Sequence, residues 1–320
     1  MPELPDVVVY VESIARRIVG SRLQLVTIAS PALLRTVDPP VAALSGLRAE
    51  GVRRLGKRVV LAFEDEHFCV IHLMIAGRFR WKDGAAALPK KLGLAAFRFE
   101  PGTLILTEAG TKRRATLHVV RGEAALAALD PGGLEVLDAD LAAFREALLR
   151  ENHTLKRSLT DPHLFSGIGN AYSDEILHRA RLSPITWTER LDEAAIQRLF
   201  DATRAVLTGW TERLRSEAEK KFPEKVTAFR PEMAVHGRYR EPCPDCGAPV
   251  QRIVYASNET NYCAPCQTGG KLLADRAMSR LLRKDWPRSL EELEARRAAQ
   301  SEGGAPSATG TRSRPSKGGT

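Results

Sequence analysis

The sequence predicts an α+β fold: an N-terminal β-sandwich with flanking helices, a helical helix–two-turn–helix domain, and a C-terminal β-hairpin finger held by four cysteines. Three observations lead to this expectation. Runs that alternate apolar and polar residues dominate the first 125 of 320 residues, helical periods of three and four follow, and two pairs of cysteines come after them. We expect domains at 1–125, 126–234 and 235–268, then a basic helical extension (269–300) and a disordered tail (301–320).

Composition and charge narrow the class of protein. Hydrophobic residues make up 43% of the chain, no apolar run is long enough to span a membrane, and the acidic N-terminus does not match a secretory signal. We therefore expect a cytoplasmic protein without a membrane partner. The net charge is +9 and the sequence pI is about 9.5, which favours a polyanionic partner, most simply nucleic acid. A merely soluble basic protein is the alternative that charge alone leaves open.

The first element is an amphipathic helix over Asp6–Val19, where apolar residues recur three and four positions apart and Gly20 marks the end. Pro5 suits its first turn, because no intrahelical N–H is needed there. Pro2 and Glu3 precede the helix, and its geometry gives no reason for either of them. The opening MPELPD therefore needs a second explanation.

Six β-type runs follow, separated by Gly, Pro, Asp or Glu, and their spacing indicates a sandwich or barrel rather than a parallel sheet. They span residues 23–30, 57–63, 68–81, 94–99, 102–107 and 115–120. The periodicity then becomes helical, and we expect helices at 140–150, 154–161, 171–181, 192–220 and 271–284. Residues 301–320 have almost no bulky apolar side chain, which predicts disorder.

Four of the five cysteines form a metal-ligand pattern. Cys243 and Cys246 enclose two residues, Cys263 and Cys266 enclose two more, and the stretch between the pairs resembles a β-hairpin that brings them together. Four thiolates at tetrahedral positions suit one Zn²⁺, and a site filled by protein ligands is structural. The alternative is a pair of disulfides, which intracellular proteins seldom keep. The fifth cysteine, Cys69, lies in an apolar strand and is expected to be buried and inert.

A glycine loop, S-G-I-G-N at 166–170, comes directly before the helix expected at 171–181. Glycines allow close backbone approach, and the free N–H groups of a helix start attract phosphate. A tight helix–helix connection is the alternative reading of such a loop. The preceding helix carries Lys156, so the unit is helix, two turns, helix.

Taken together, PELPD at the start, GKR at 56–58, TLKRSLTD at 154–161, SGIGNAYSDEIL at 166–177 and a finger closing in YCAPCQ resemble the formamidopyrimidine-DNA glycosylase/endonuclease VIII family. The resemblance covers residues 2 to about 268. It implies a bifunctional DNA glycosylase/AP lyase that excises oxidised bases in base-excision repair, with damaged DNA as partner, one structural zinc, no nucleotide cofactor and a monomeric state. The alternative is a non-enzymatic damaged-DNA-binding zinc protein with the same fold.

The resemblance also implies roles for five residues. Pro2, exposed by removal of the initiator methionine, would be the amine nucleophile that forms a Schiff base with the sugar, which explains a proline at this position. Glu3 would be the carboxylic proton donor beside it. Lys57 would hold a phosphate and assist β-elimination. Lys156 and Asn170 would contact the DNA backbone, which positions DNA without reading its sequence.

Three departures from the family pattern concern the contacts with DNA. The methionine wedge of relatives becomes Ile75 on a strict register, with Met74 one residue earlier, and the loop that supplies an arginine and an aromatic wedge reads TEAGTKRRA at 107–115. The finger arginine of relatives is Asn258, and Arg252 is a candidate for the missing cation. An enzyme that extrudes a base must fill the vacated space. The sequence therefore predicts the reaction class but not the lesion.

Overall fold

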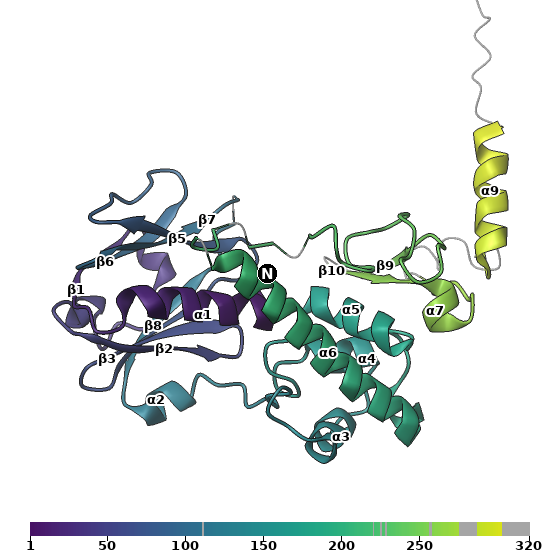
Figure 1. Cartoon of the computed structure of the whole chain (residues 1–320), viewed down its shortest axis with the longest axis horizontal. Coiled ribbons are helices and arrows are strands. Elements are labelled where there is room, and N and C mark those ends of the chain that lie inside the picture. The colour runs from purple at the N-terminus through teal and green to yellow at the C-terminus, as the bar shows by residue number, and fades with distance from the viewer. Residues whose placement is uncertain are drawn as a thin grey trace, which may run out of the picture.

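The computed structural model describes residues 1–110, 112–219, 221–224, 226–227, 229–255, 258–274 and 287–302. Two antiparallel sheets form one half of the body, helices form the other, and a two-stranded finger lies beyond the helices (Figure 1). The predicted α+β architecture is confirmed. In the described part of the chain, no helix is both long and apolar enough to cross a membrane.

Helix α1 spans Leu4–Ile18 and joins the two halves (Figure 1). Pro5 lies in its first turn, as predicted, although the helix begins two residues earlier than expected. It ends before Gly20, whose φ of 86° favours glycine. One face packs on the sheet that contains β2 (Ala49–Leu55) and β3 (Arg58–Phe63), and another packs on helix α6 (Glu193–Ala218). The N-terminal residues are therefore held at the junction of the two halves.

The sandwich consists of two four-stranded sheets with antiparallel neighbours. The first has the order β1 (Leu23–Ile28), β6 (Gly93–Phe99), β7 (Gly102–Glu108) and β5 (Gly77–Asp83). The second has the order β2 (Ala49–Leu55), β3 (Arg58–Phe63), β4 (His67–His72) and β8 (Thr116–Arg121). Short 3-10 helices at Pro31–Leu33 and Val41–Leu44 connect β1 to β2. Buried aromatic and aliphatic side chains of both sheets and α1 form one core, and α2 (Glu123–Ala127) covers part of the outer face of the second sheet.

The run 68–81, predicted as one strand, is two strands joined by a turn at Leu73–Gly77. The N–H of Gly77 donates to the Leu73 carbonyl at 2.9 Å, and a Cβ at position 77 would lie 2.2 Å from that oxygen. The turn carries the chain from one sheet to the other, because β4 pairs with β3 and β8 whereas β5 pairs with β7. Residues 73–76 are all apolar and no turn-favouring residue comes before Gly77, so the sequence pattern gave no sign of a turn here.

Strand β2 was not predicted, because AEGVRRL contains a glycine and few β-branched residues. It pairs with β3 in a hairpin whose two-residue turn is Gly56 and Lys57, and Gly56 has a φ of 59°. The hairpin presents Lys57 at its tip, which fixes the position of this predicted catalytic residue.

The helical half contains α3 (Leu141–Leu149), α4 (Leu155–Thr160), α5 (Asn170–Ala180), a 3-10 turn (Thr188–Arg190) and α6. These positions agree with the prediction within one or two residues. Leu4 at the start of α1 belongs to the helical core, and Phe222 and Val226 after α6 belong to the sandwich core. The two halves therefore exchange segments, and the exact domain boundaries stay predictions.

The finger contains β9 (Gln251–Tyr255), β10 (Asn258–Tyr262) and α7 (Ala264–Thr268), which confirms the predicted hairpin. Helix α9 (Leu290–Glu302) lies mostly in the predicted extension and continues through 301–302, where the prediction of disorder is wrong. The helix expected at 271–284 falls mostly outside the described residues, and its described part, 271–274, is not helical. Most of the predicted disordered tail, 303–320, also lies outside the described residues.

Candidate active site and metal centre

The N-terminus lies where the sandwich meets the helical half (Figure 1). Pro2 and Glu3 are both buried. The backbone N–H of Leu4 donates to the Gly167 carbonyl at 2.9 Å, and a Cβ at Gly167 would lie 2.8 Å from the Leu4 Cβ. The first glycine of the S-G-I-G-N loop therefore lets the N-terminal segment pack closely against the loop.

The Glu3 carboxylate accepts hydrogen bonds from three backbone N–H groups at the start of α5. Gly169 donates at 2.7 Å, Ala171 at 2.9 Å and Tyr172 at 3.2 Å. These are free N–H groups at the positive end of the helix dipole, where an anion is stabilised. The anion at this helix start is therefore Glu3, not the phosphate that the glycine loop suggested on its own.

Asp6, whose role the sequence did not indicate, lies in the first turn of α1, three residues after Glu3. Its Oδ2 accepts the Glu3 backbone N–H at 3.0 Å, and its Oδ1 has no hydrogen-bond partner among the described residues. Burial, with a smaller contribution from the Glu3 charge, raises the pKa of Asp6 to about 7. The available sequence signal was an acidic residue three positions after a helix cap, which is usual for purely structural reasons.

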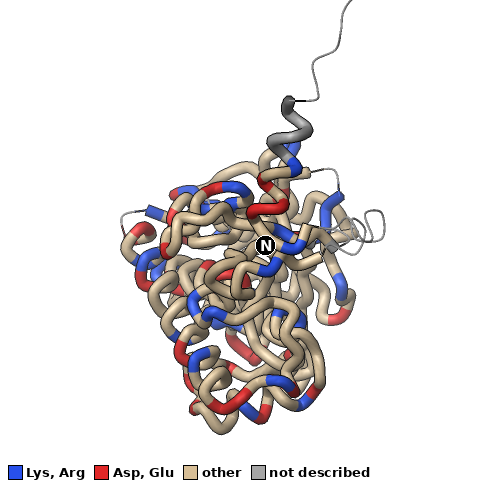
Figure 2. The backbone as a smooth tube through the Cα atoms, turned by 90° about the vertical axis from the view of Figure 1, so that its right-hand side faces the viewer, with Lys and Arg blue, Asp and Glu red and all other residues tan. Residues whose placement is uncertain are grey.

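Met1, Lys57 and His72 line one cavity of about 340 Å³ at the N-terminus. Burial lowers the pKa of the terminal amine at Met1 and that of Lys57, while the Glu3 charge opposes both shifts. Burial also lowers the pKa of His72 to about 4, so this ring is neutral at pH 7, and its Nδ1 accepts the Met74 N–H at 3.0 Å. Figure 2 shows basic positions beside the N-terminus. An amine here loses its proton more readily than it would in water.

Asp6 also lines a larger cavity, of about 740 Å³, between α1, β5 and the segment that follows α6. In its wall the Arg17 guanidinium lies 5.9 Å from the Trp81 ring centre and 5.3 Å from that of Phe222. Arg230 and Lys221 line the same cavity. The N-terminal segment thus borders both cavities.

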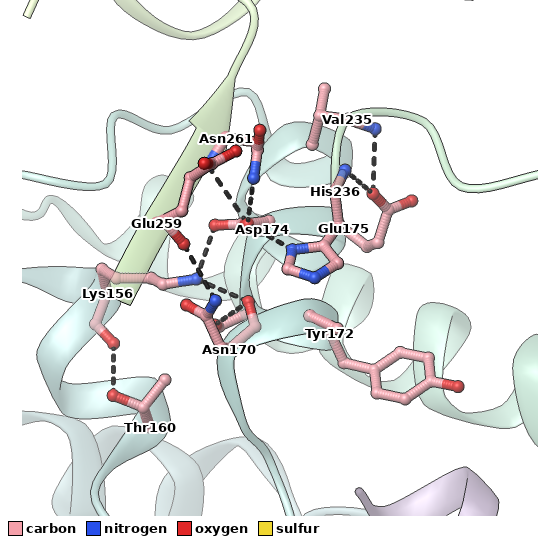
Figure 3. Close-up of polar contacts among 12 residues, drawn as sticks. Lys156, Thr160, Asn170, Tyr172, Asp174, Glu175, Val235, His236, Glu259 and Asn261 are labelled. Carbon is pink, nitrogen blue, oxygen red and sulfur yellow. Dashed lines mark hydrogen bonds and ion pairs between the residues drawn. The ribbon is translucent and has the colours of Figure 1, made fainter. Parts of the chain in front are cut away.

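Lys156 and Asn170 meet at the start of α5 (Figure 3). The Lys156 ammonium donates to the Asn170 carbonyl at 2.6 Å and to the Asp174 carboxylate at 2.5 Å. The Asn170 side-chain amide donates to the backbone carbonyl of Glu259 in β10 at 2.9 Å. Asn170 therefore also holds the finger hairpin against α5, and Lys156 holds α4 against α5.

Asp174 is the central acceptor of this network, and the sequence analysis did not identify it. Its side chain is fully buried, and besides Lys156 it accepts hydrogen bonds from the His236 ring at 2.8 Å and the Asn261 backbone at 3.1 Å (Figure 3). Next to it, Glu175 accepts three backbone N–H groups from Ala234, Val235 and His236. The Asp-Glu pair of α5 thereby fixes the segment that leads into the finger.

A second unpredicted contact ties the β2–β3 hairpin to the helical half. The Arg54 guanidinium donates to the Gly56 carbonyl at 2.8 Å, to the Ser166 hydroxyl at 3.2 Å and to the Glu135 carboxylate. Ser166 in turn donates to Glu135 at 2.6 Å. Because Gly56 precedes Lys57, this network sets the position of Lys57 relative to the glycine loop.

The predicted wedge residues lie at the β4–β5 turn. Ile75 is 57% exposed at its tip, and Met74 beside it has a φ of 51°. An exposed apolar side chain on a tight turn can enter a base stack. In the neighbouring loop, buried Glu108 accepts the backbone N–H groups of Arg114 and Ala115, and Thr111 lies outside the described residues.

The remaining predicted DNA contacts are in the finger. Arg252 pairs with Glu259 at 3.0 Å, and its guanidinium lies 4.2 Å from the Tyr239 ring centre. Its charge is therefore partly balanced within the hairpin. Asn258 begins β10 opposite Tyr255, and its side chain lies outside the described part of the structure.

The four finger cysteines form one cluster. Their sulfur atoms all lie within 4.8 Å of one another, with Cys246 and Cys263 3.4 Å apart and Cys243 and Cys266 4.0 Å apart. These separations exceed a disulfide bond and are close to the roughly 3.8 Å expected between sulfurs 2.3 Å from a tetrahedral zinc. All five cysteines of the chain are free thiols, which excludes the disulfide alternative. Cys69 is buried in an apolar strand and is not part of this cluster, so the four cysteines that could hold a metal ion are the predicted four.

The two-sheet sandwich, the helix–two-turn–helix unit and the four-cysteine hairpin together define a class of proteins in which a β-sandwich and a helical half are followed by a four-cysteine finger. Two family models match: the formamidopyrimidine-DNA glycosylase N-terminal domain over residues 1–116 and the formamidopyrimidine-DNA glycosylase H2TH domain over residues 131–218. A formamidopyrimidine-DNA glycosylase of Thermus thermophilus is 34% identical over 278 residues, covering 84% of this chain and the whole of that protein. The chain belongs to the formamidopyrimidine-DNA glycosylase/endonuclease VIII family.

Solved structures agree with this assignment. The crystal structure of the MutM (Fpg) protein from Thermus thermophilus is 33% identical, with a TM-score of 0.72 over 83% of this chain and 98% of that one. A Lactococcus lactis enzyme variant in complex with a Fapy-dG-containing DNA is 27% identical, with a TM-score of 0.74 over 83% of this chain and all of that one.

Proposed function

We propose that this protein is a zinc-containing DNA glycosylase with AP-lyase activity that excises oxidised bases in base-excision repair. The observation that carries the proposal is the placement of Glu3, whose carboxylate is held by three backbone N–H groups beside a buried N-terminus and Lys57. The family assignment and the DNA complexes of its structural neighbours give further support. We also propose a monomer without a nucleotide cofactor, which acts on DNA in the bacterial cytoplasm.

In the proposed reaction, removal of Met1 frees the Pro2 nitrogen. Its lone pair bonds to the sugar C1′, the glycosidic bond breaks, and the base leaves with the bonding electrons and takes up a proton. The nitrogen gives its proton to the Glu3 carboxylate, which passes it to the ring oxygen O4′ as the ring opens, and the nitrogen becomes an iminium. The iminium withdraws electrons, so the C2′ proton is removed and the C3′–oxygen bond breaks, releasing the 3′ phosphate.

Lys57 suits a supporting role in the elimination. It lies at the tip of the β2–β3 hairpin on the wall of the N-terminal cavity. A cationic ammonium here would hold the phosphate that leaves from C3′. The tether of Arg54 to Glu135 and Ser166 keeps the hairpin tip in place during the reaction.

The cavity of about 740 Å³ has room for an extruded base, and we propose that it receives one. Asp6 in its wall offers an unpaired Oδ1, and the Arg17 guanidinium with Trp81 and Phe222 offers planar surfaces for stacking. Ile75, with Met74 behind it, would fill the space that the base vacates.

The four cysteines fit a single structural Zn²⁺, which would hold the β9–β10 hairpin closed, because the finger has a core of only a few buried residues. We propose that the finger, Lys156, Asn170 and Arg252 contact the phosphate backbone of the DNA. Affinity should therefore fall steeply as the salt concentration rises.

Reductive trapping tests the proposal. Incubation with abasic-site DNA and borohydride should yield a covalent adduct whose proteolysis places it on the N-terminal peptide, because an iminium is reducible. Pro2→Gly or a retained N-terminal extension should weaken or remove it, while DNA binding persists. An adduct on an internal lysine would overturn the role of Pro2. Tight binding of damaged DNA with no adduct and no strand cleavage would favour the non-enzymatic DNA-binding protein instead.

A further inference from the structure

The last turn of α5 places a histidine against the finger cysteines. His178 is 3% exposed, and its Nε2 lies 3.3 Å from the Cys243 sulfur and 4.0 Å from the Asp245 carboxylate. One ligand atom each from His178, Asp245 and Cys266 also lies within 4.8 Å of the others. A buried imidazole in this position must either ligate the metal or donate a hydrogen bond to a ligand.

The cysteine cluster decides between these two roles. Four sulfurs already complete a tetrahedral site, so a fifth protein ligand has no position to fill. The complex of Zn²⁺ with four thiolates has a net negative charge, and N–H donors directed at the sulfur atoms stabilise this charge. The backbone N–H of Ala248 is directed at Cys246 and that of Cys266 at Cys263. The Nε2 of His178, 3.3 Å from the Cys243 sulfur, is placed where the corresponding donor would lie.

We propose that His178 is a positioning residue that donates its Nε2–H to the zinc-bound thiolate of Cys243 and thereby sets the affinity of the finger for zinc. This inference rests on the proposed zinc site and extends it to a residue outside the finger. Groups that orient metal ligands in this way typically contribute about 10–100-fold to metal affinity.

The position of His178 has a structural consequence. The same helix binds the Glu3 carboxylate at its first turn, the hairpin backbone through Asn170, and the Cys243 sulfur at its last turn. Close by, the Gln267 side chain accepts the Cys263 N–H at 2.9 Å and donates to the Leu182 carbonyl just beyond α5 at 2.9 Å. The end of α5 and the metal site are thus joined by two separate contacts.

A matched pair of variants in the full-length protein tests the proposal. His178→Gln keeps an N–H donor at the same reach, whereas His178→Met has similar length and no donor. Zinc affinity is measured by competition with a chromogenic chelator, and the Co²⁺-substituted proteins are compared by absorption spectroscopy. His163→Gln serves as control, because that ring contacts the Pro131 carbonyl and not the finger.

We expect His178→Met to bind zinc about 10–100-fold more weakly than the wild-type protein, with His178→Gln within a few-fold of it and the Co²⁺ spectrum unchanged in both. Equal affinities of the Met and Gln variants would overturn the inference alone. A Co²⁺ spectrum that changes in both variants would also overturn it, since the histidine would then be a ligand. A wild-type protein that binds no zinc would instead overturn the proposed metal site, and this inference with it.

Discussion

The Glu3 carboxylate and the Gly169 backbone N–H are 2.7 Å apart, although 166 positions separate the two residues in the sequence. A Cβ at position 169 would lie 2.5 Å from the Glu3 Cδ and 2.6 Å from its Oε1. The second glycine of the S-G-I-G-N loop is therefore required by the carboxylate that rests on it. Its φ of −134° is open to any residue, so the requirement is one of space and not of backbone conformation.

Gly169→Ala should therefore impair the reaction by displacing the Glu3 carboxylate. The added methyl group must push the carboxylate away from the three N–H groups, so base excision and borohydride trapping should fall by about 100-fold or more, in the range of a lost general acid. Affinity for abasic-site DNA should change little. Gly209→Ala in α6 is the matched control, because nothing lies within 4 Å of its Cβ and alanine favours a helix there. Activity of Gly169→Ala equal to that of Gly209→Ala would contradict the prediction.

Asp6 should make the stability of the protein depend on pH in an identifiable way. Its folded-state pKa of about 7 lies above the ordinary value of 3.8, so between about pH 4 and pH 7 the folded state keeps a proton that the unfolded state has lost. The free energy of unfolding contributed by this group is therefore fully present below about pH 4 and is lost as the pH rises to 7. At 1.36 kcal/mol per pKa unit, the loss is on the order of 4 kcal/mol.

Urea unfolding of the wild-type protein and Asp6→Asn at several pH values checks this prediction. The variant should resemble the protonated wild type near pH 4, since the asparagine Oδ1 can still accept the Glu3 N–H. The free energy of unfolding of the variant should rise relative to that of the wild type as the pH approaches 7, and the difference between the two should stay constant above pH 7. Parallel stability curves from pH 4 to pH 8 would show that Asp6 does not hold its proton in this way.

Much of the fold was predictable because its signals are local. Periods of two and of three to four gave the strands and helices of both halves, and the cysteine spacing gave the finger. Strand β2 was missed because its glycine weakens the strand pattern, and the turn at Leu73–Gly77 was missed because an unbroken apolar run covers it. The role of Asp174 was missed because only tertiary packing brings its partners Lys156, His236 and Asn261 together. The role of Asp6 was missed because an acidic residue three positions after a helix cap, here bonded to the Glu3 backbone, is usual for structural reasons alone.

Asp174→Asn should destabilise the junction between α5 and the finger. Oδ2 accepts from both the His236 ring and the Asn261 backbone, so an amide nitrogen there would face donors, and the Lys156 ammonium would lose its counter-charge. Removing one partner of a buried pair costs about 3–5 kcal/mol. Glu193→Gln is the control, because its pair with Arg145 is exposed and worth about 0–1 kcal/mol. Chemical denaturation compares the two, and a similar small loss in both would rule out Asp174 as the central acceptor.

The last prediction concerns Asn258 at the start of β10, where the family resemblance implies an arginine that would hold phosphates beside the lesion and assist a second elimination. A neutral amide can donate a hydrogen bond, but charge-assisted bonds are roughly twice as strong. Arg252 pairs with Glu259 and lies against the Tyr239 ring, so only part of its charge is available to the phosphates that it is proposed to contact. Pro2, Glu3 and Lys57 are unaffected. We therefore expect the first strand cut to persist and the second to be slow, which leaves mainly 3′-unsaturated aldehyde ends on denaturing gels.

Asn258→Arg should shift the products toward 3′-phosphate, with Asn258→Gln as the uncharged control. Mainly 3′-phosphate from the unmodified protein would mean that another cation serves the second elimination, and Arg252→Gln and Arg240→Gln would then identify it.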